Sequence, residues 1–188
     1  QRTSAPGVWA AGDCCQSTHI VSGRPVHVPL GTTANKQGRV AGINMSGGYA
    51  TFPGVLGTAV TRVCDVEIGR TGLSEREAAD AGFAPVASRI EATTTAGYMP
   101  GASRITVKLV SEKVGGRILG VQIVGGQGSA KRVDVVAAAL VGKLTLEDLV
   151  QLDLGYAPPY SPVWDPVQVA ARQSLRRAPL DANGKSSR

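Results

Sequence analysis

A β-hairpin pattern in the middle of the chain limits the fold more than any other feature. Ile105, Val107 and Leu109 alternate with polar or charged residues, as in a strand that buries one face. The glycine pair at residues 115–116 allows a turn, and a more apolar segment follows over residues 118–124. We therefore predict two antiparallel strands within a half-buried sheet.

Further strands are predicted before this hairpin, over residues 59–64, 66–69 and 86–95. Ser74 and Glu77 have the spacing of a capping box and begin a short helix between these strands.

Three helices are predicted after the hairpin. Apolar residues recur at helical spacing from Val133 to Leu144, and Thr145 begins a second, shorter helix. Asp165 followed by Pro166 is typical of the start of a helix, which we expect to continue to about Leu175. Strands grouped ahead of helices predict an α+β domain, an antiparallel sheet with helices on one face. The uncovered face favours a twofold partner.

A short α/β segment precedes this domain. Residues 7–11 are apolar and predict a buried strand that ends in a turn at Gly12 and Asp13. Thr32 or Thr33 is expected to cap a helix that continues to about Met45, with two glycines ending it. The N-terminus of that helix could face an anion or an electron-rich ring, or the helix could simply be packed with no ligand.

Composition and charge exclude several classes of protein. The 188 residues carry a net charge of +6, and five basic residues against one acidic residue leave +4 of it from residue 172 onward. Such a tail is typical of a disordered, solvated end, and the rest of the chain has no basic stripe with aromatic residues between the charges. We therefore expect no nucleic-acid partner. We also expect no membrane span, because no apolar run approaches the length required.

Three cysteines do not make a disulfide framework, which favours a cytoplasmic location. His19 and His27 lie near Cys14 and Cys15, but the spacing is not that of a zinc site, and no metal is expected. We interpret Cys14 and Cys15 as a buried structural pair.

A stiff, proline-rich stretch occupies residues 155–166. Tyr156, Tyr160 and Trp164 recur every four residues, and in an extended chain this spacing would place them on one face. Such a loop suits a partner surface or a ligand pocket, and it would equally suit a lid over the domain's own core.

Four segments occur in the order found in one protein family: residues 7–13, 31–39, 96–101 and 156–161. Together they resemble the C-terminal part of the FAD-dependent pyridine nucleotide–disulfide oxidoreductases, in the branch of coenzyme A-disulfide reductase and NADH oxidase. The resemblance implies that residues 1–50 end an FAD-binding domain. It implies that residues 51–176 form a dimerisation domain, followed by a disordered basic tail over residues 177–188.

The same resemblance assigns the cofactor-binding residues. Gly12 and Asp13 form one cofactor-binding turn, in which Asp13 matches the aspartate that binds the ribityl chain of FAD. Leu30, Gly31 and Thr32 match the backbone that approaches the flavin ring at a helix N-terminus.

The resemblance also implies a homodimer in which the tyrosine loop reaches the partner's active site. Tyr98 and Tyr156 match positions that border the substrate, and Tyr160 is a further candidate. The implied substrate is a disulfide, peroxide or oxygen, reduced with NAD(P)H. The family's His-Pro acid/base is replaced here by residues 156–159, which argues against the glutathione and lipoamide branch.

No catalytic residue is expected in this chain. The family's redox cysteine and nicotinamide domain have no counterpart in it, so the chain is interpreted as a fragment that is inactive alone. The alternative is a stand-alone dimerisation or ligand-binding module without redox activity.

Overall fold

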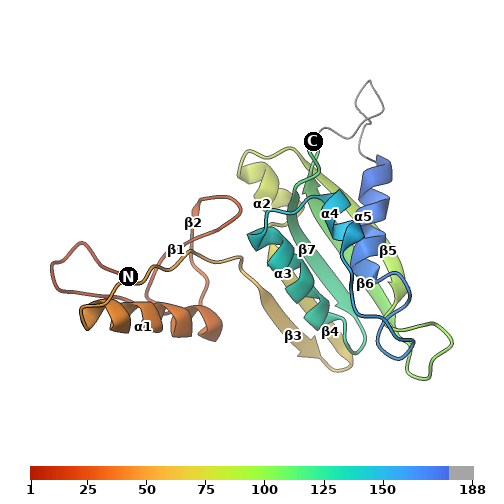
Figure 1. Cartoon of the computed structure of the whole chain (residues 1–188), viewed down its shortest axis with the longest axis horizontal. Helices are drawn as coiled ribbons and strands as arrows, with labels where there is room; N and C mark the ends of the chain where they lie inside the picture. Colours follow the sequence, from red (N-terminus) through yellow and green to blue (C-terminus); the bar gives the residue numbers. More distant parts are fainter. Residues whose placement is uncertain (178–188) are drawn as a thin grey trace. The chain divides into compact units, whose positions relative to one another are not determined.

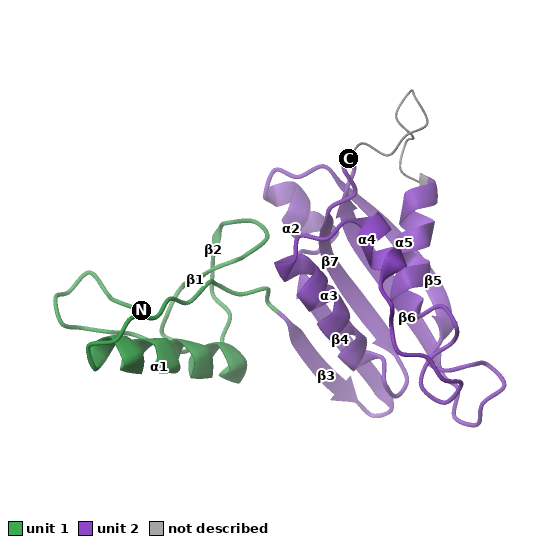
Figure 2. Ribbon diagram, in the orientation of Figure 1, with its two compact units in different colours: residues 1–57 green, residues 58–188 purple. Residues whose placement is uncertain are grey.

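The computed structural model describes residues 1–177 and divides the chain into two compact units, Gln1–Gly57 and Thr58–Arg188 (Figure 2). The division falls after Gly57. The boundary at residue 50 between an FAD-binding and a dimerisation domain stays a prediction. Arg177 ends the last helix instead of beginning the expected tail, and the rest of that tail lies outside the described residues.

Unit 1 contains a small two-stranded sheet and one long helix. Strand β1 (Ser17–Thr18) pairs with β2 (Pro25–Val26), and helix α1 spans Gly31–Met45. Five apolar side chains are buried here: Val21, Val40, Ala41, Val55 and Leu56.

Helix α1 begins without the threonine cap that we predicted. Its N-cap is Leu30, with an extended backbone and no side-chain cap bond. Thr33 lies inside the first turn and is buried, so its side chain is part of the packing and does not cap the helix. The predicted end is confirmed: Gly47 has a φ of 86°, and the Gly48 N–H donates to the Ile43 carbonyl at 2.9 Å, which is a Schellman ending.

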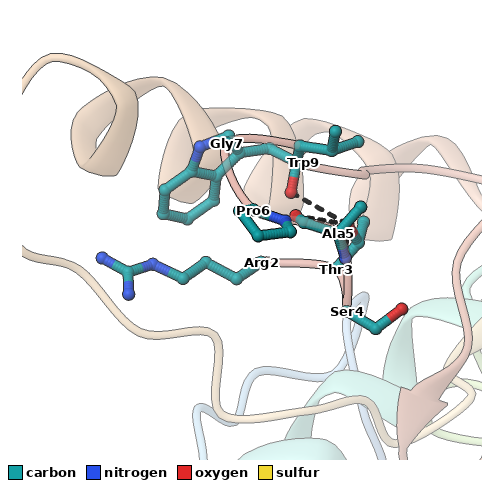
Figure 3. A pocket seen from close by; sticks show the side chains of 8 residues that line it. Arg2, Thr3, Ser4, Ala5, Pro6, Gly7 and Trp9 are labelled. Carbon is teal, nitrogen blue, oxygen red and sulfur yellow. Dashed lines mark hydrogen bonds between the residues drawn. The ribbon is translucent and has the colours of Figure 1, made fainter.

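The strand predicted over residues 7–11 is wrong. Trp9 forms a single isolated bridge with Arg2, and the side chain of Val8 is 51% exposed. The chain instead turns back on itself, and the Arg2 guanidinium lies 5.3 Å from the centre of the Trp9 ring (Figure 3). Residues 2–9 line an open hollow of about 400 Å³, which includes none of the predicted site residues. An apolar run needs a neighbouring strand to become a strand, and among the described residues this one meets only Arg2.

Unit 2 is built on a five-stranded antiparallel sheet with the strand order β3-β4-β7-β6-β5 (Figure 1). The strands are β3 (Ala59–Val63), β4 (Val66–Gly72), β5 (Pro85–Thr93), β6 (Arg104–Glu112) and β7 (Ile118–Gly125). The predicted hairpin is confirmed as β6 and β7, with Leu109 opposite Val121. Ile105, Val107 and Leu109 are fully buried, as their alternation predicts.

The helices of unit 2 are α2 (Glu75–Asp80), the short 3₁₀ helix η1 (Ala130–Arg132), α3 (Val133–Val141), α4 (Leu146–Gln151) and α5 (Pro166–Arg177). In Figure 1, α3, α4 and α5 cover one face of the sheet. Close approach on this face requires Gly69, because a Cβ there would lie 2.7 Å from Cγ1 of Val133. This is the α+β arrangement that the order of elements predicts.

Local capping explains where three of these helices begin. Ser74 and Glu77 form the predicted capping box of α2, and Thr145 forms another with Asp148 at α4. The Val167 N–H donates to the Asp165 carboxylate at 2.9 Å, so Asp165 caps α5 as expected.

The opposite face of the sheet is only partly covered. Arg70 and Lys108 alternate with helix-facing residues and bind Glu77 and Glu75 of α2. Elsewhere on this face, Ile68 lies opposite Val124, and both are exposed, together with Val63 and Val66.

Within residues 1–177, no helix has the length and apolar character needed to cross a membrane.

Candidate functional site

The predicted cofactor residues of unit 1 gather where a tight turn meets the first turn of α1. Gly12 has a φ of 88°, a conformation that favours glycine, and its N–H donates to Oε1 of Gln37 at 2.8 Å. A Cβ at Gly12 would lie 3.4 Å from Cβ of Ala34, so the turn packs directly on the helix. Gln37 is 1% exposed and also donates from Nε2 to Oγ of Ser17 at 2.8 Å. Local sequence patterns did not indicate this role for Gln37.

The turn and the helix start leave polar groups accessible. Asp13 is exposed, and its carbonyl oxygen accepts a hydrogen bond from Nε2 of His27 at 2.8 Å. Gly31 and Thr32 are exposed in the first turn of α1, where backbone N–H groups have no acceptor within the helix. No acidic side chain occupies that first turn. The Asp13 carboxylate can accept a hydrogen bond from a hydroxyl group, and the N–H groups at the start of the helix can donate hydrogen bonds to an electron-rich group.

Cys14 and Cys15 do not form the buried pair that we expected. Cys14 and Cys64 are exposed and Cys15 is half-buried, because Cys14 and Cys15 lie on the same surface turn as Asp13. Partial burial, and then the neighbouring Cys14 thiol, raise the pKa of the Cys15 thiol. Within the described part of the chain, no three His, Cys, Asp or Glu side chains gather as a metal site.

In unit 2 the structure brings the two tyrosine-bearing loops together. The Ala96 N–H donates to the Pro158 carbonyl at 3.1 Å, which joins the loop of Tyr98 to the loop of Tyr156 and Tyr160. Tyr98 is 78% exposed, Tyr156 50% and Tyr160 79%. Three aromatic side chains on linked loops therefore lie open to solvent and available for contact.

The proline-rich loop is not extended, which corrects the prediction that its aromatic residues share one face. The N–H groups of Tyr160 and Ser161 both donate to the Ala157 carbonyl, at 2.9 and 3.1 Å, so the chain turns there. Trp164 instead lies against helix α5, with the Arg172 guanidinium 4.4 Å from its ring centre.

A buried arginine holds both loops in place. Arg132 pairs through Nε with the Asp165 carboxylate at 2.9 Å, and the two side chains are only 10% and 13% exposed. Its Nη2 donates to the carbonyl of Thr94 at 2.6 Å and to that of Tyr160 at 3.2 Å. Its Nη1 donates to the Gly128 carbonyl at 2.8 Å. One guanidinium therefore binds backbone carbonyls of both loops. Sequence reasoning had missed this role of Arg132.

This fold corresponds to a known family. The family described as "Pyridine nucleotide-disulphide oxidoreductase, dimerisation domain" matches residues 58–166, more than half of the chain. The chain therefore belongs to this family, as the resemblance of its motifs indicated.

Two curated relatives and one solved structure illustrate the similarity. The chain is 47% identical over 171 residues to a protein of Pyrococcus horikoshii named NAD(P)H coenzyme A polysulfide/persulfide reductase, covering 91% of this chain and 38% of the relative. It is 38% identical over 176 residues to an NADH oxidase of Methanocaldococcus jannaschii, covering 94% of this chain and 39% of the relative.

The solved structure is an NAD-dependent persulfide reductase from A. fulgidus, which matches with a TM-score of 0.90 at 41% identity over 94% of this chain and 32% of that one. The chain thus spans well under half the length of these relatives.

Proposed function

We propose that this chain forms part of an NAD(P)H-dependent flavoprotein oxidoreductase that acts on a disulfide, a persulfide, a peroxide or oxygen. The observation that carries the proposal is the bond from Ala96 to Pro158, residues 62 positions apart in sequence, which joins the two tyrosine loops. The family match and the names of the relatives support the same reaction class.

The residues of unit 1 fit the sugar chain and ring of FAD. The exposed carboxylate of Asp13 is suited to accept a hydrogen bond from a ribityl hydroxyl. The N–H groups of Gly31 and Thr32, after Leu30, are suited to donate to the ring edge, and a Cβ built at Gly31 would meet nothing within 4 Å. FAD, when bound, supplies transfer of electrons from NAD(P)H to the acceptor.

The residues of unit 2 would position the acceptor. Tyr98, Tyr156 and Tyr160 present rings and hydroxyl groups that can pack against a substrate and donate hydrogen bonds to it. Arg132 limits their motion by holding the backbone of both loops. We assign no catalytic residue to the chain.

We further propose a homodimer in which the tyrosine loops face the partner. The exposed apolar residues on the open face of the sheet, Ile68 and Val124 with Val63 and Val66, support association, because such a patch is costly to leave in water. Sedimentation of the chain tests this directly, and a monomer at high concentration would contradict it.

The test of the reaction is turnover by the intact parent enzyme with NADH or NADPH and, in turn, coenzyme A disulfide, a persulfide, peroxide and oxygen. Substitution of Tyr98 and Tyr156 by Phe is expected to raise KM for the true acceptor about tenfold, since each hydroxyl can form one hydrogen bond with it. The KM for the nicotinamide cofactor should not change. Turnover of none of the acceptors, or equal effects on both substrates, would contradict the proposal.

A flavin titration of this chain alone tests how much of the flavin site the chain contains. We expect weak binding of FAD at most, because the chain offers only the few contacts described above. Tight binding would show that the chain contains a complete flavin site.

A further inference from the structure

The turn that carries Asp13 also brings two thiols together. In an extended chain, the side chains of successive residues point to opposite sides. Here the Cys15 N–H donates to the Gly12 carbonyl at 2.9 Å and closes a turn, and the Sγ atoms of Cys14 and Cys15 lie 3.9 Å apart. Since Cys14 is exposed and Cys15 is half-buried, a reagent in solution can reach the pair.

Two adjacent thiols limit the kinds of ligand that can bind at this turn. Zinc in proteins takes four protein ligands, or three and a water, and the described residues offer no group of three around this turn. A soft centre that needs only two sulfur ligands suits the site better, because thiolates prefer soft acceptors. Trivalent arsenic of the type R–As=O satisfies this condition, since its third substituent stays attached.

We propose that Cys14 and Cys15 form a dithiol site that chelates trivalent arsenicals. In the binding step, two S–H bonds and the As=O bond break, and two As–S bonds form. The oxygen leaves as water with both thiol protons. Arsenic remains trivalent and both sulfurs keep their oxidation state, so the reaction needs no oxidant or reductant. The proposal does not depend on the proposed flavin chemistry.

The second As–S bond is intramolecular, and this explains the expected affinity. Linking two donors in one chain raises the effective concentration of the second, so loss of either thiol should weaken binding by about 100-fold or more. Cys64 lies in the turn between β3 and β4, where no second cysteine accompanies it. It is therefore the matched control for a single exposed thiol.

The experiment is a titration of the reduced chain with phenylarsine oxide, followed by intact mass spectrometry. We expect one phenylarsenic adduct for each chain, and the same adduct in Cys64→Ser. Cys14→Ser and Cys15→Ser should each lose it at the same reagent concentration. A dithiol competitor should remove the adduct, and a monothiol at equal thiol concentration should not.

Several results would overturn the proposal: no adduct on the original chain, retention of full affinity by either single variant, or loss of the adduct in Cys64→Ser. Circular dichroism of each variant checks that the fold is intact. Should either serine variant misfold, methylation of the thiols of the original chain before titration tests the same requirement. Zinc ions offered instead of the arsenical should bind no more tightly to the original chain than to Cys14→Ser. If the original chain binds zinc and Cys14→Ser does not, zinc and not the arsenical is the ligand of the site, and the proposal is wrong.

Discussion

The two units of the chain are stabilised by different kinds of burial. Unit 2 has a thick apolar core, in which Ile105, Val107, Leu109, Val121 and Ile123 are all fully buried. In unit 1 the most buried apolar side chains, Val21 and Val40, are each 6% exposed, while the polar Gln37 is 1% exposed. Unit 2 thus depends on packing between a sheet and helices, and unit 1 depends more on a buried hydrogen-bond network.

A single buried polar side chain nevertheless organises the candidate site residues in each unit. Gln37 ties the Gly12 turn to α1, and Arg132 ties the two tyrosine loops to the start of α5. The difference lies in charge: a buried guanidinium must be paired, whereas a buried amide needs only hydrogen bonds. The two tryptophans allow each unit to be followed separately, since Trp9 lies in unit 1 and Trp164 in unit 2.

The largest effect is expected from Arg132→Met. Removal of the guanidinium leaves the Asp165 carboxylate nearly buried and unpaired, which should lower the free energy of unfolding of unit 2 by about 3–5 kcal/mol. Urea denaturation in a Trp9→Phe background, followed by the fluorescence of Trp164, measures this loss. Hydrogen exchange at the Ala96 amide should also accelerate, because its acceptor is on the loop that Arg132 holds.

The matched control for this prediction is Arg89→Met. Arg89 pairs with Glu91 at 3.1 Å, but both side chains are about two-thirds exposed, at 66% and 68%. Its loss should cost at most about 1 kcal/mol. Equal effects of the two substitutions would mean that burial does not increase the contribution of the Arg132 pair to stability. The contrast between a buried charge in unit 2 and a buried amide in unit 1 would then lose its basis.

The next effect compares the same substitution in both cores. Val107→Ala should destabilise unit 2 by about 2–3 kcal/mol, through lost burial and the cavity left between rigid neighbours. Val40→Ala should destabilise unit 1 by about 1–2 kcal/mol, since a thinner core can relax around the smaller side chain. The paired denaturation curves, read through Trp164 and Trp9 respectively, give both values. Val114→Ala, in the exposed turn between β6 and β7, is the control, and a larger loss for Val40→Ala would reverse the comparison.

Local sequence signals were sufficient to predict much of unit 2. Ser74 with Glu77 and Asp165 with Pro166 act within a few residues, so their spacing alone predicts the caps that the structure contains. The alternation of apolar residues in β6 is equally local and predicts the buried face.

Interactions between distant residues could not be predicted in this way. Gln37 meets Gly12 across 25 positions, and Arg132 meets the Thr94 carbonyl across 38. Arginine and glutamine are usually exposed, so nothing in the local pattern distinguishes these two from surface residues. The wrong strand at residues 7–11 has the same origin, because apolar character does not reveal whether a neighbouring strand is present.

A smaller effect is expected from Gln37→Leu in unit 1. The substitution leaves the Gly12 N–H and the Ser17 hydroxyl without their partner, which should cost about 1–3 kcal/mol. Denaturation in a Trp164→Phe background, read through Trp9, measures it. Gln16→Leu is the control, because Gln16 is exposed and directly precedes Ser17 in the sequence. An unchanged unit 1 would show that its apolar contacts, and not its buried amide, hold the Gly12 turn on α1.

The smallest effect concerns a half-exposed ion pair on unit 2, between Glu77 and Arg70 at 2.6 Å. Partial burial raises the pKa of the Glu77 carboxyl, but hydrogen bonds from Arg70 and from the Ser74 N–H outweigh it and lower the pKa overall. The unfolded chain therefore takes up this proton first as the pH falls. The pair should stabilise the fold fully above the ordinary glutamate pKa of 4.5 and lose its contribution below it.

Glu77→Gln tests this prediction, because glutamine can still complete the capping box while the charge is removed. Near neutral pH the variant should be less stable by about 0.5–1 kcal/mol, a value limited by solvent screening of a pair that is 40% and 46% exposed. As the pH falls through the folded pKa of Glu77, the melting temperatures of the two proteins should converge. The control is Glu91→Gln, whose carboxylate pairs with Arg89 within strand β5. A difference that persists in acid would mean that Glu77 acts through its shape in the cap and not through its charge, and the surface of unit 2 would then resemble unit 1 in depending on neutral hydrogen bonds.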